Sequence, residues 1–417
     1  MFRKEVLDNG VRVVTERIPS VRSVSIGIWV DVGSRDEQPG EEGFSHFIEH
    51  MVFKGTRRRS AEAISREIDA LGGELNAFTS RECTTFYAKV LDEHLTQGLD
   101  LLADIFHHSR FDAREVAKEK QVVLEEIRMV EDDPEDYLHD LHTKNALRSH
   151  PLGRPVLGEV ATIEALRRAP LLSFRARHYR PSQVVVAVAG NFAFGPVLKQ
   201  LASAFGGPWD SETGSAHRVP PTVTKGVHVR SKPLEQAHIC VGAKGIAHSD
   251  KDRYAVYVLN AVLGGGVSSR LFQEVREKRG LAYSIYSFVT CFTDSGLVTV
   301  YAGVRPDAAP RAIRLILKEL RRLQDKPVGR AELERAKSQL KGNLMLGLES
   351  TSSRMSKLAK DELYFGCHIP LRQVMADIDA ISADQLWRLS RELFDDRFLA
   401  LTALGPLQKG DVARVMQ

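Results

Sequence analysis

The chain of 417 residues has little cysteine and only a small excess of positive charge. Its four cysteines, Cys83, Cys240, Cys291 and Cys367, lie far apart and form no CxxC pair, so neither a zinc knuckle nor a disulfide framework is indicated. The net charge of +4 is too small to suggest a nucleic-acid partner. The one tight basic run, residues 57–59, is interpreted as a solvated loop or helix start.

The sequence also lacks any apolar run long enough to span a membrane, since the run at residues 184–189 has the length of a strand. The first residues contain no apolar core of a secretory signal. We therefore expect no membrane association and a cytoplasmic location. A hydrophobic content of 43% is enough for a large core, and the length suggests two or three domains.

Two similar halves are visible in the order of the predicted elements. Residues 24–32 alternate in hydrophobicity, which predicts a half-buried strand, and residues 44–53 and 113–130 follow a helical period. After a segment at 211–226 that is rich in Gly, Pro, Ser and Thr, strands and helices follow in the same order again. Strands cluster apart from runs of helices, which disfavours a βαβ repeat.

The predicted fold class is therefore α+β, with two structurally similar halves that each pack a mixed or antiparallel sheet with helices. We expect a domain at residues 1–210, a linker at 211–226 and a second domain of the same plan at 227–417.

An HxxEH motif lies in the first predicted helix. His46 and His50 are four residues apart, so their imidazoles project from one helix face and can share a metal ion. Glu49 borders that face and can take a proton from a water molecule on the metal. The pattern is the inverted form of the HExxH zinc motif. Alternatively the three are polar residues of an amphipathic helix, but Phe47 and Ile48 make the helix apolar, and buried polar groups need partners.

A catalytic zinc ion needs a third protein ligand and an open position. Glu119 and Glu126 lie seven residues apart on the helix predicted at 113–130, so they differ by roughly 20° around its axis and flank its apolar side. We expect Glu126 to bind the metal and Glu119 to orient a histidine or hold a proton. The alternative is that both are surface glutamates of a charged helix, because Lys118 and Lys120 are near.

Longer motifs surround these residues, and together they are specific. The chain resembles the pitrilysin/insulinase (M16) family of zinc metallopeptidases over nearly its whole length. It is most similar to the short-chain branch with the bacterial processing proteases and the β subunit of the mitochondrial processing peptidase. The motifs are GFSHFIEHMVFKGT at 43–56, GGELNAFTS at 72–80, EKQVVLEEI at 119–127 and GGGVSSRLFQEVREKRGLAY at 264–283.

The resemblance assigns a role to each candidate in the first half. It implies one zinc ion per chain, bound by His46, His50 and Glu126. Glu49 would be the general base, and Glu119 would support the ligands. Residues 1–210 would then be the catalytic, zinc-binding domain.

The resemblance also implies how substrate is bound. Asn76, Ala77 and Phe78 would form an edge strand that pairs with the substrate backbone, although Asn76 taken alone could be a turn residue. Arg276 and Tyr283 from the second half would reach the substrate, with Tyr283 donating to the developing oxyanion. Taken alone, Arg276 is one charge of a basic run and Tyr283 an aromatic residue of a strand.

The second half does not repeat the metal motif. When the two halves are aligned on the glycines that follow each helix, Val256, Leu259 and Asn260 stand in place of His46, Glu49 and His50. The implied function is a zinc-dependent metalloendopeptidase that cleaves short or unfolded polypeptides held in a chamber between domains. Relatives of this length use two chains, which implies a homodimer or a heterodimer with an inactive paralogue. The alternatives are a non-catalytic scaffold subunit of the same fold and a hydrolase of non-peptide bonds.

Overall fold

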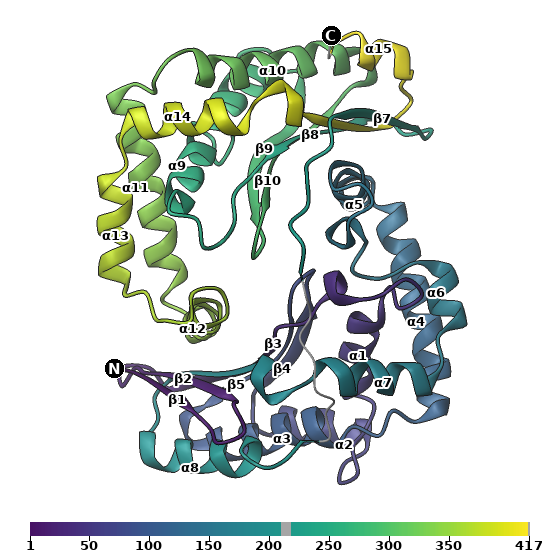
Figure 1. Ribbon diagram of the computed structural model, residues 1–417, viewed down its shortest axis with the longest axis vertical. Helices are drawn as coiled ribbons and strands as arrows, with labels where there is room; N and C mark the ends of the chain where they lie inside the picture. The colour runs from purple at the N-terminus through teal and green to yellow at the C-terminus, as the bar shows by residue number, and fades with distance from the viewer. Residues whose placement is uncertain (210–217, 416–417) are drawn as a thin grey trace. The chain divides into compact units, whose positions relative to one another are not determined.

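The computed structural model describes residues 1–209 and 218–415, which form two compact units (Figure 1). The first unit contains Met1–Arg128, Arg154–Arg218 and Gly347–His368, and the second contains Met129–Gly153, Val219–Leu346 and Ile369–Gln417. Each unit is an α+β structure with one sheet, so the predicted fold class and the repetition of one plan are confirmed.

The sheet of the first unit has the strand order β1-β2-β6-β3-β5-β4. Neighbouring strands are antiparallel except β2 and β6, which are parallel. The strands are β1 (Phe2–Val6), β2 (Arg12–Arg17), β3 (Ser23–Val30), β4 (Glu74–Thr79), β5 (Thr84–Leu91) and β6 (Val184–Gly190). Among the described residues β4 pairs only with β5, so it forms one edge of the sheet.

Helices from the first half of the sequence pack against one face of this sheet and enclose its main hydrophobic core. They are α1 (Phe44–Val52), α2 (Ala61–Ala70), α3 (Leu95–His108), α4 (Ala113–Asp132), α6 (Val160–Ala165), α7 (Arg168–His178) and α8 (Phe194–Phe205). The first turn of α2 illustrates the local signals, because Ser60 caps it by accepting a hydrogen bond from the N–H of Ala63 at 3.1 Å.

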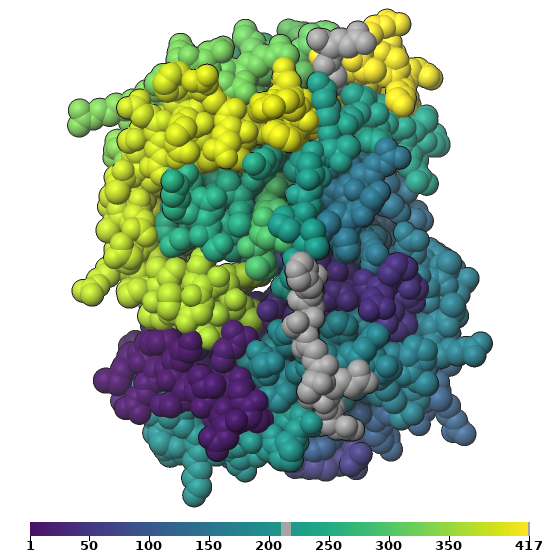
Figure 2. Space-filling view, in the orientation of Figure 1, coloured from purple at the N-terminus to yellow at the C-terminus, as the bar shows by residue number. Residues whose placement is uncertain are grey.

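The opposite face of the first sheet is covered by a helix from the second half of the sequence, α12 (Thr351–Phe365). The sulfur of its Met355 accepts a hydrogen bond from the indole N–H of Trp29 at 3.4 Å. The hydroxyl of its Thr351 lies 2.9 Å from the hydroxyl of Ser25. Figure 2 shows the side chains of α12 directly against those of the N-terminal strands, where Glu362 pairs with Lys4 at 2.8 Å.

The strand predicted at residues 24–32 is consequently not half-buried, and this part of the prediction was wrong. Every residue of β3 after Ser23 is buried, because helices cover both faces of the sheet. Gly27 allows α12 to pack against the second face of the sheet, since a Cβ at this position would lie 2.4 Å from Met355 Sδ.

The second unit repeats the arrangement with the strand order β7-β11-β8-β10-β9, in which only β7 and β11 are parallel. The strands are β7 (Gly226–Ser231), β8 (Ala237–Lys244), β9 (Ala282–Cys291), β10 (Gly296–Val304) and β11 (Ala400–Gly405). The helices from the second half are α9 (Arg253–Leu263), α10 (Ala309–Asp325), α11 (Arg330–Gly347), α13 (Leu371–Ala380), α14 (Ala383–Leu393) and α15 (Lys409–Ala413). Strand for strand, β8, β9 and β10 correspond to β3, β4 and β5.

A helix from the first half completes the second unit in the same way. α5 (Pro134–Ala146) packs on β8 and β11, and its buried His142 lies so close to Gly242 that a Cβ there would be 2.1 Å from His142 Nε2. The two units therefore exchange one helix each, and they differ in this respect from the predicted domains at 1–210 and 227–417. The predicted linker at 211–226 lies partly outside the described residues.

Two further observations bear on the predicted elements. Residues Phe272–Glu277 form a π-helical segment. No helix in the described part of the chain is both long enough and apolar enough to cross a membrane. The cytoplasmic location stays a prediction.

We predict that α12 stabilises the first unit. Replacing Met355, which is 1% exposed, with Ala should lower the free energy of unfolding by about 2–5 kcal/mol, because it leaves a cavity against Trp29. Urea denaturation followed by tryptophan fluorescence measures this change. Met345 at the end of α11 is 52% exposed, so Met345→Ala should change the stability by less than about 0.5 kcal/mol. Equal losses in the two variants would contradict the role of α12.

Candidate metal centre

The helix that carries the HxxEH motif, α1, is largely buried. Phe47, Ile48 and Met51 are 0% exposed and anchor one side of α1 in the core of the first unit. The motif residues lie on another side, where His46 and His50 stand one turn apart with ring centroids 4.6 Å from each other. The predicted helix is thus present, and its two imidazoles are neighbours.

Glu126 from α4 completes a triangle with the two histidines. The Nε2 atoms of His46 and His50 are 3.2 Å apart, and the Oε2 atom of Glu126 lies 3.7 Å from the first and 3.4 Å from the second. Ligand bonds of about 2.0–2.1 Å in a tetrahedron around zinc require ligand atoms roughly 3.4 Å apart. The three atoms are therefore spaced as the ligands of one zinc ion would be.

The surroundings of these atoms also fit a cation. The buried Oε2 atom of Glu126 has no hydrogen-bond donor within the described residues, and a buried acceptor without a partner is costly. Burial, with a contribution from the charge of His50, lowers the pKa of His46 to about 3, so this imidazole is neutral near pH 7. A neutral imidazole and a carboxylate are the forms that bind a metal. The residues present therefore fit a zinc ion.

Glu119 is placed to orient one of the ligands. Its Oε2 atom lies 3.1 Å from Nδ1 of His50, and its Oε1 atom lies 2.7 Å from the amine of Lys54. A proton on Nδ1 that is donated to Glu119 leaves the lone pair of Nε2 free for a metal. Glu119 is only 4% exposed, so Lys54 supplies the countercharge that such a buried carboxylate needs.

Glu49 lies beside the triangle and is held by strand β4. Its Oε2 atom accepts a hydrogen bond of 2.6 Å from the hydroxyl of Thr79, the last residue of β4. Burial raises the pKa of Glu49, and the charge of Glu126 raises it further, while the hydrogen bond from Thr79 and the charge of His50 oppose the shift. A carboxylate with a raised pKa next to a metal centre suits a general base.

The predicted edge strand is also found next to α1. Asn76, Ala77 and Phe78 lie in β4, at the edge of the first sheet, with Asn76 and Phe78 exposed and Ala77 half-buried. The ring of Phe78 packs edge-on against Trp29, with centroids 5.5 Å apart. The structure thus brings together His46, His50, Glu126, Glu119, Glu49 and an unpaired strand edge in one unit.

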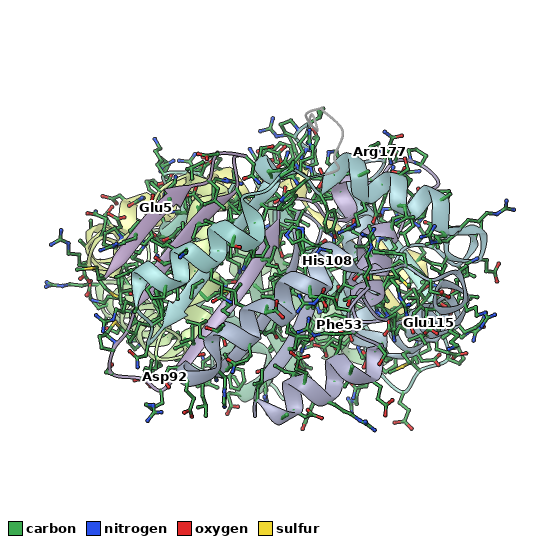
Figure 3. All side chains as sticks on the ribbon, turned by 90° about the horizontal axis from the view of Figure 1, so that it is seen from below. Glu5, Phe53, Asp92, His108, Glu115 and Arg177 are labelled. Carbon is green, nitrogen blue, oxygen red and sulfur yellow. The ribbon has the colours of Figure 1, made fainter. Side chains whose placement is uncertain are left out.

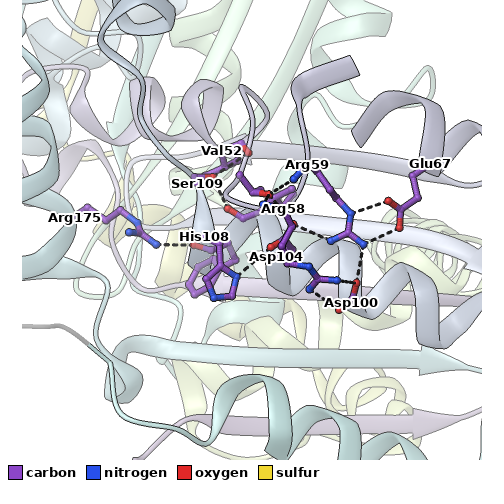
Figure 4. Close-up of polar contacts among 12 residues, drawn as sticks. Val52, Arg58, Arg59, Glu67, Asp100, Asp104, His108, Ser109 and Arg175 are labelled. Atoms are coloured by element: carbon purple, nitrogen blue, oxygen red, sulfur yellow. Dashed lines mark hydrogen bonds and ion pairs between the residues drawn. The ribbon is translucent and has the colours of Figure 1, made fainter. Parts of the chain in front are cut away.

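A polar network at the other end of α1 was not predicted (Figure 4). Ser109 donates to the carbonyl of Val52 at 3.1 Å, and this contact joins the last turns of α1 and α3, near Phe53 and His108 in Figure 3. Arg59 donates to Asp104 in the same network.

Arg59 is 11% exposed in its side chain and pairs with three carboxylates, those of Glu67, Asp100 and Asp104, at 2.7–2.8 Å. The interpretation of residues 57–59 as a solvated run was therefore wrong for Arg59. The sequence signal that could have revealed this was weak, because the carboxylates come from two separate helices.

The remaining two candidates belong to the second unit. Tyr283 is the second residue of the edge strand β9 and is 79% exposed, and the guanidinium carbon of Arg276 lies 5.6 Å from the centre of its ring. The two residues are therefore neighbours, and their role towards a substrate stays a prediction. Helix α9 of this unit has buried Val256 and Leu259 at the positions that correspond to His46 and Glu49. Among the described residues, His46, His50 and Glu126 form the one group that could hold a metal.

Two family models match most of this chain. The model of the insulinase family (peptidase family M16) matches residues 12–160, and the model of the peptidase M16 inactive domain matches residues 165–340. An uncharacterized zinc protease of Bacillus subtilis (strain 168) is 43% identical over 406 residues, which are 97% of this chain and 98% of that protein.

Two solved structures share the fold. A protease from Helicobacter pylori superposes with a TM-score of 0.90 at 24% identity and covers 97% of this chain and 99% of that one. A structure titled peptidase M16 inactive domain, from Pseudomonas fluorescens, superposes with a TM-score of 0.89 at 20% identity, covering 98% of both chains. From the full-length similarity to the zinc protease and the two family models, we conclude that this chain belongs to the M16 (insulinase) family of peptidases.

Proposed function

We propose that this chain is a zinc-dependent metalloendopeptidase that holds one zinc ion through His46, His50 and Glu126. The observation that supports it most is the triangle of two imidazole nitrogens and one carboxylate oxygen, with sides of 3.2–3.7 Å. A bound zinc ion would supply Lewis acidity that polarises the peptide carbonyl and makes water a better nucleophile near neutral pH.

The side chains around the triangle perform the proton transfers. Glu49 accepts a proton from the attacking water and returns it to the amine that leaves, while Thr79 keeps one carboxylate oxygen fixed. Glu119 holds the imidazole of His50 in one orientation and one tautomer. Tyr283 donates to the developing oxyanion and Arg276 fixes a neighbouring carbonyl of the substrate.

The substrate is an extended peptide. Main-chain groups at the free edge of β4, at Asn76, Ala77 and Phe78, pair with its backbone, which selects for extended conformation more than for sequence. Folded proteins cannot present such a strand easily, so short or unfolded polypeptides are favoured. Enclosure of the substrate between the two halves, the cytoplasmic location, and assembly as a homodimer or with an inactive paralogue remain parts of this proposal.

A non-catalytic scaffold is the competing function. The family model that matches residues 165–340 is described as an inactive domain, and the second half has Val256 and Asn260 at the positions of His46 and His50. The first half brings His46, His50 and Glu126 together with Glu49 beside them, and this supports catalysis over a scaffold role.

The first prediction from this proposed function concerns the metal. The purified protein should contain about one zinc per chain by elemental analysis and should release fragments from a mixed peptide library read by mass spectrometry, and 1,10-phenanthroline should abolish this release. Glu126→Gln should lose both zinc and activity. Glu125→Gln is the matched control, because Glu125 lies on the same helix but pairs only with Arg128 at the surface. Peptide release that is insensitive to the chelator would contradict the proposal.

The second prediction separates the general base from the ligands. Glu49→Gln should lower kcat by about 100-fold to 10,000-fold, because the amide cannot accept a proton from water. Its zinc content should stay near that of the unmodified protein, because Glu49 lies outside the triangle. Loss of zinc together with activity would instead make Glu49 a ligand.

The third prediction concerns the second unit. Tyr283→Phe and Arg276→Ala should each lower kcat by about 100-fold, the effect of losing one donor to an oxyanion or carbonyl. Zinc content and thermal stability should not change, because Tyr283 is 79% exposed. Unchanged peptide cleavage in both variants would remove this pair from the mechanism.

A further inference from the structure

A buried carboxylate outside the HxxEH motif contacts the start of the helix that carries it. Glu37 is 3% exposed, and its two oxygens accept hydrogen bonds from the backbone N–H groups of Gly43 at 2.9 Å and Ser45 at 2.8 Å. These N–H groups lie at the N-terminus of α1, where the helix offers them no internal acceptor. His46 follows directly in the chain.

This contact replaces a cap that the sequence cannot provide locally. The N-cap residue of α1 is Gly43, with φ at +93°, and a Cβ there would lie 2.7 Å from the carbonyl of Leu157 and 2.8 Å from Ile163 Cδ1. The Ser, Thr, Asp or Asn side chain that usually caps a helix is therefore excluded at this position. Glu37 supplies the acceptors from a segment six residues upstream.

The segment that carries Glu37 is anchored to the turn between β4 and β5. The N–H groups of Ser34 and Arg35 donate to the carbonyls of Ser80 and Arg81 at 3.3 and 2.8 Å. The buried side chains of Arg35 and Glu82 pair at 2.6 Å. The segment at residues 33–37 is therefore fixed to the β4–β5 hairpin. The outer strand of this hairpin, β4, is the proposed peptide-binding edge.

The carboxylate is held in a costly environment. Burial raises the pKa of Glu37 to about 8, against the two backbone hydrogen bonds and the charge of Arg154, which lower it. Arg154 also donates to the backbone carbonyl of Glu37 at 2.5 Å. The two N–H groups and Arg154 offset part of the cost of burying this acid.

We propose that Glu37 is a positioning residue, which fixes the first turn of α1, and with it His46, relative to the β4–β5 hairpin. The hydrogen bond from Thr79 to Glu49 makes a second link between the same two elements, one helical turn further along. Together the two links set the distance between the edge strand that binds the peptide and the groups that cleave it. This inference rests on the proposed peptidase function, because it assigns β4 to substrate binding.

An ordinary cap makes a different prediction from a positioning residue. A cap contributes stability alone, as the hydroxyl of Ser60 does for α2. A positioning residue also changes the geometry of the metal centre and the chemical step, and it does so even where the protein remains folded.

The test compares Glu37→Gln with Glu41→Gln. The side-chain amide of the first variant offers one acceptor oxygen in place of two, so it cannot satisfy both N–H groups. Glu41 is the matched control, because it lies in the same loop, accepts a hydrogen bond from the N–H of Gln38 and pairs with Arg177, but its side chain does not contact α1. If the glutamine variant does not fold, Glu37→Asp is compared with Glu41→Gln in its place.

Three measurements on the whole chain decide the outcome. Peptide cleavage by Glu37→Gln should show kcat lowered by about 10-fold to 100-fold with KM changed by less than about two-fold, since small misplacements of reacting groups are costly. Zinc affinity, measured by competition with a chromophoric chelator, should fall by about 10-fold. The visible absorption of the Co²⁺-loaded protein should shift, while Glu41→Gln matches the unmodified protein in all three.

A Glu37→Gln variant that is less stable than the control but equal to it in kcat, zinc affinity and Co²⁺ spectrum would overturn the proposal, because Glu37 would then be only a cap. If the unmodified protein binds zinc but cleaves no peptide, the proposed function fails. The zinc affinity and Co²⁺ spectra of the same variants then still decide whether Glu37 positions α1.

Discussion

The metal centre depends on one spatial constraint, which is that α1 and α4 keep a fixed distance and rotation. Two of its candidate ligand atoms come from α1 and the third from α4, and their separations of 3.2–3.7 Å leave little tolerance. A zinc–ligand bond is about 2.0–2.1 Å long, so a shift of one helix by even about 1 Å would break the set. The surrounding contacts can be understood as means of preventing that shift.

Helix α1 is restrained at both ends and in the middle, and at its first turn the restraint is Glu37. Its buried face packs in the core of the first unit, its last turn is joined to α3 through Ser109, and Glu49 is joined to β4 through Thr79. Glu119 restrains the imidazole of His50 from α4. Polar groups that are buried and aligned before any ligand arrives need no reorganisation during a reaction, which is the main way in which an active site lowers a barrier.

Much of this site could be predicted from the sequence, because its signals are local and periodic. The spacing of His46 and His50 and that of Glu119 and Glu126 each describe one helix face, and the structure places all four around the same point. The repeated order of strands and helices in the two halves could be predicted for the same reason, because each strand and each helix has its own periodicity. Thr79 and Lys54 could not be found this way, because they act across elements.

The exchange of α5 and α12 marks the limit of such local signals. Helix amphipathicity shows that a helix is covered on one side but does not identify the sheet that covers it. One clue was present, because residues 184–189 form a continuous apolar run, and such a run is typical of a strand that is buried on both faces. That pattern required a cover for the second face of the sheet, but the chain offers several helices that could supply it.

The exchange also constrains how the two halves can diverge. Gly27 in β3 and Gly242 in β8 occupy corresponding strands, and each leaves the space that a side chain of the exchanged helix fills, Met355 in one unit and His142 in the other. Each sheet therefore depends on a helix from the other half of the sequence, so neither half can lose its fold without exposing the other's core. In the second half, Val256 and Leu259 stand at the positions of His46 and Glu49 and pack in a core that needs no ion. The fold thus depends on both halves, although the candidate metal ligands all lie in one of them.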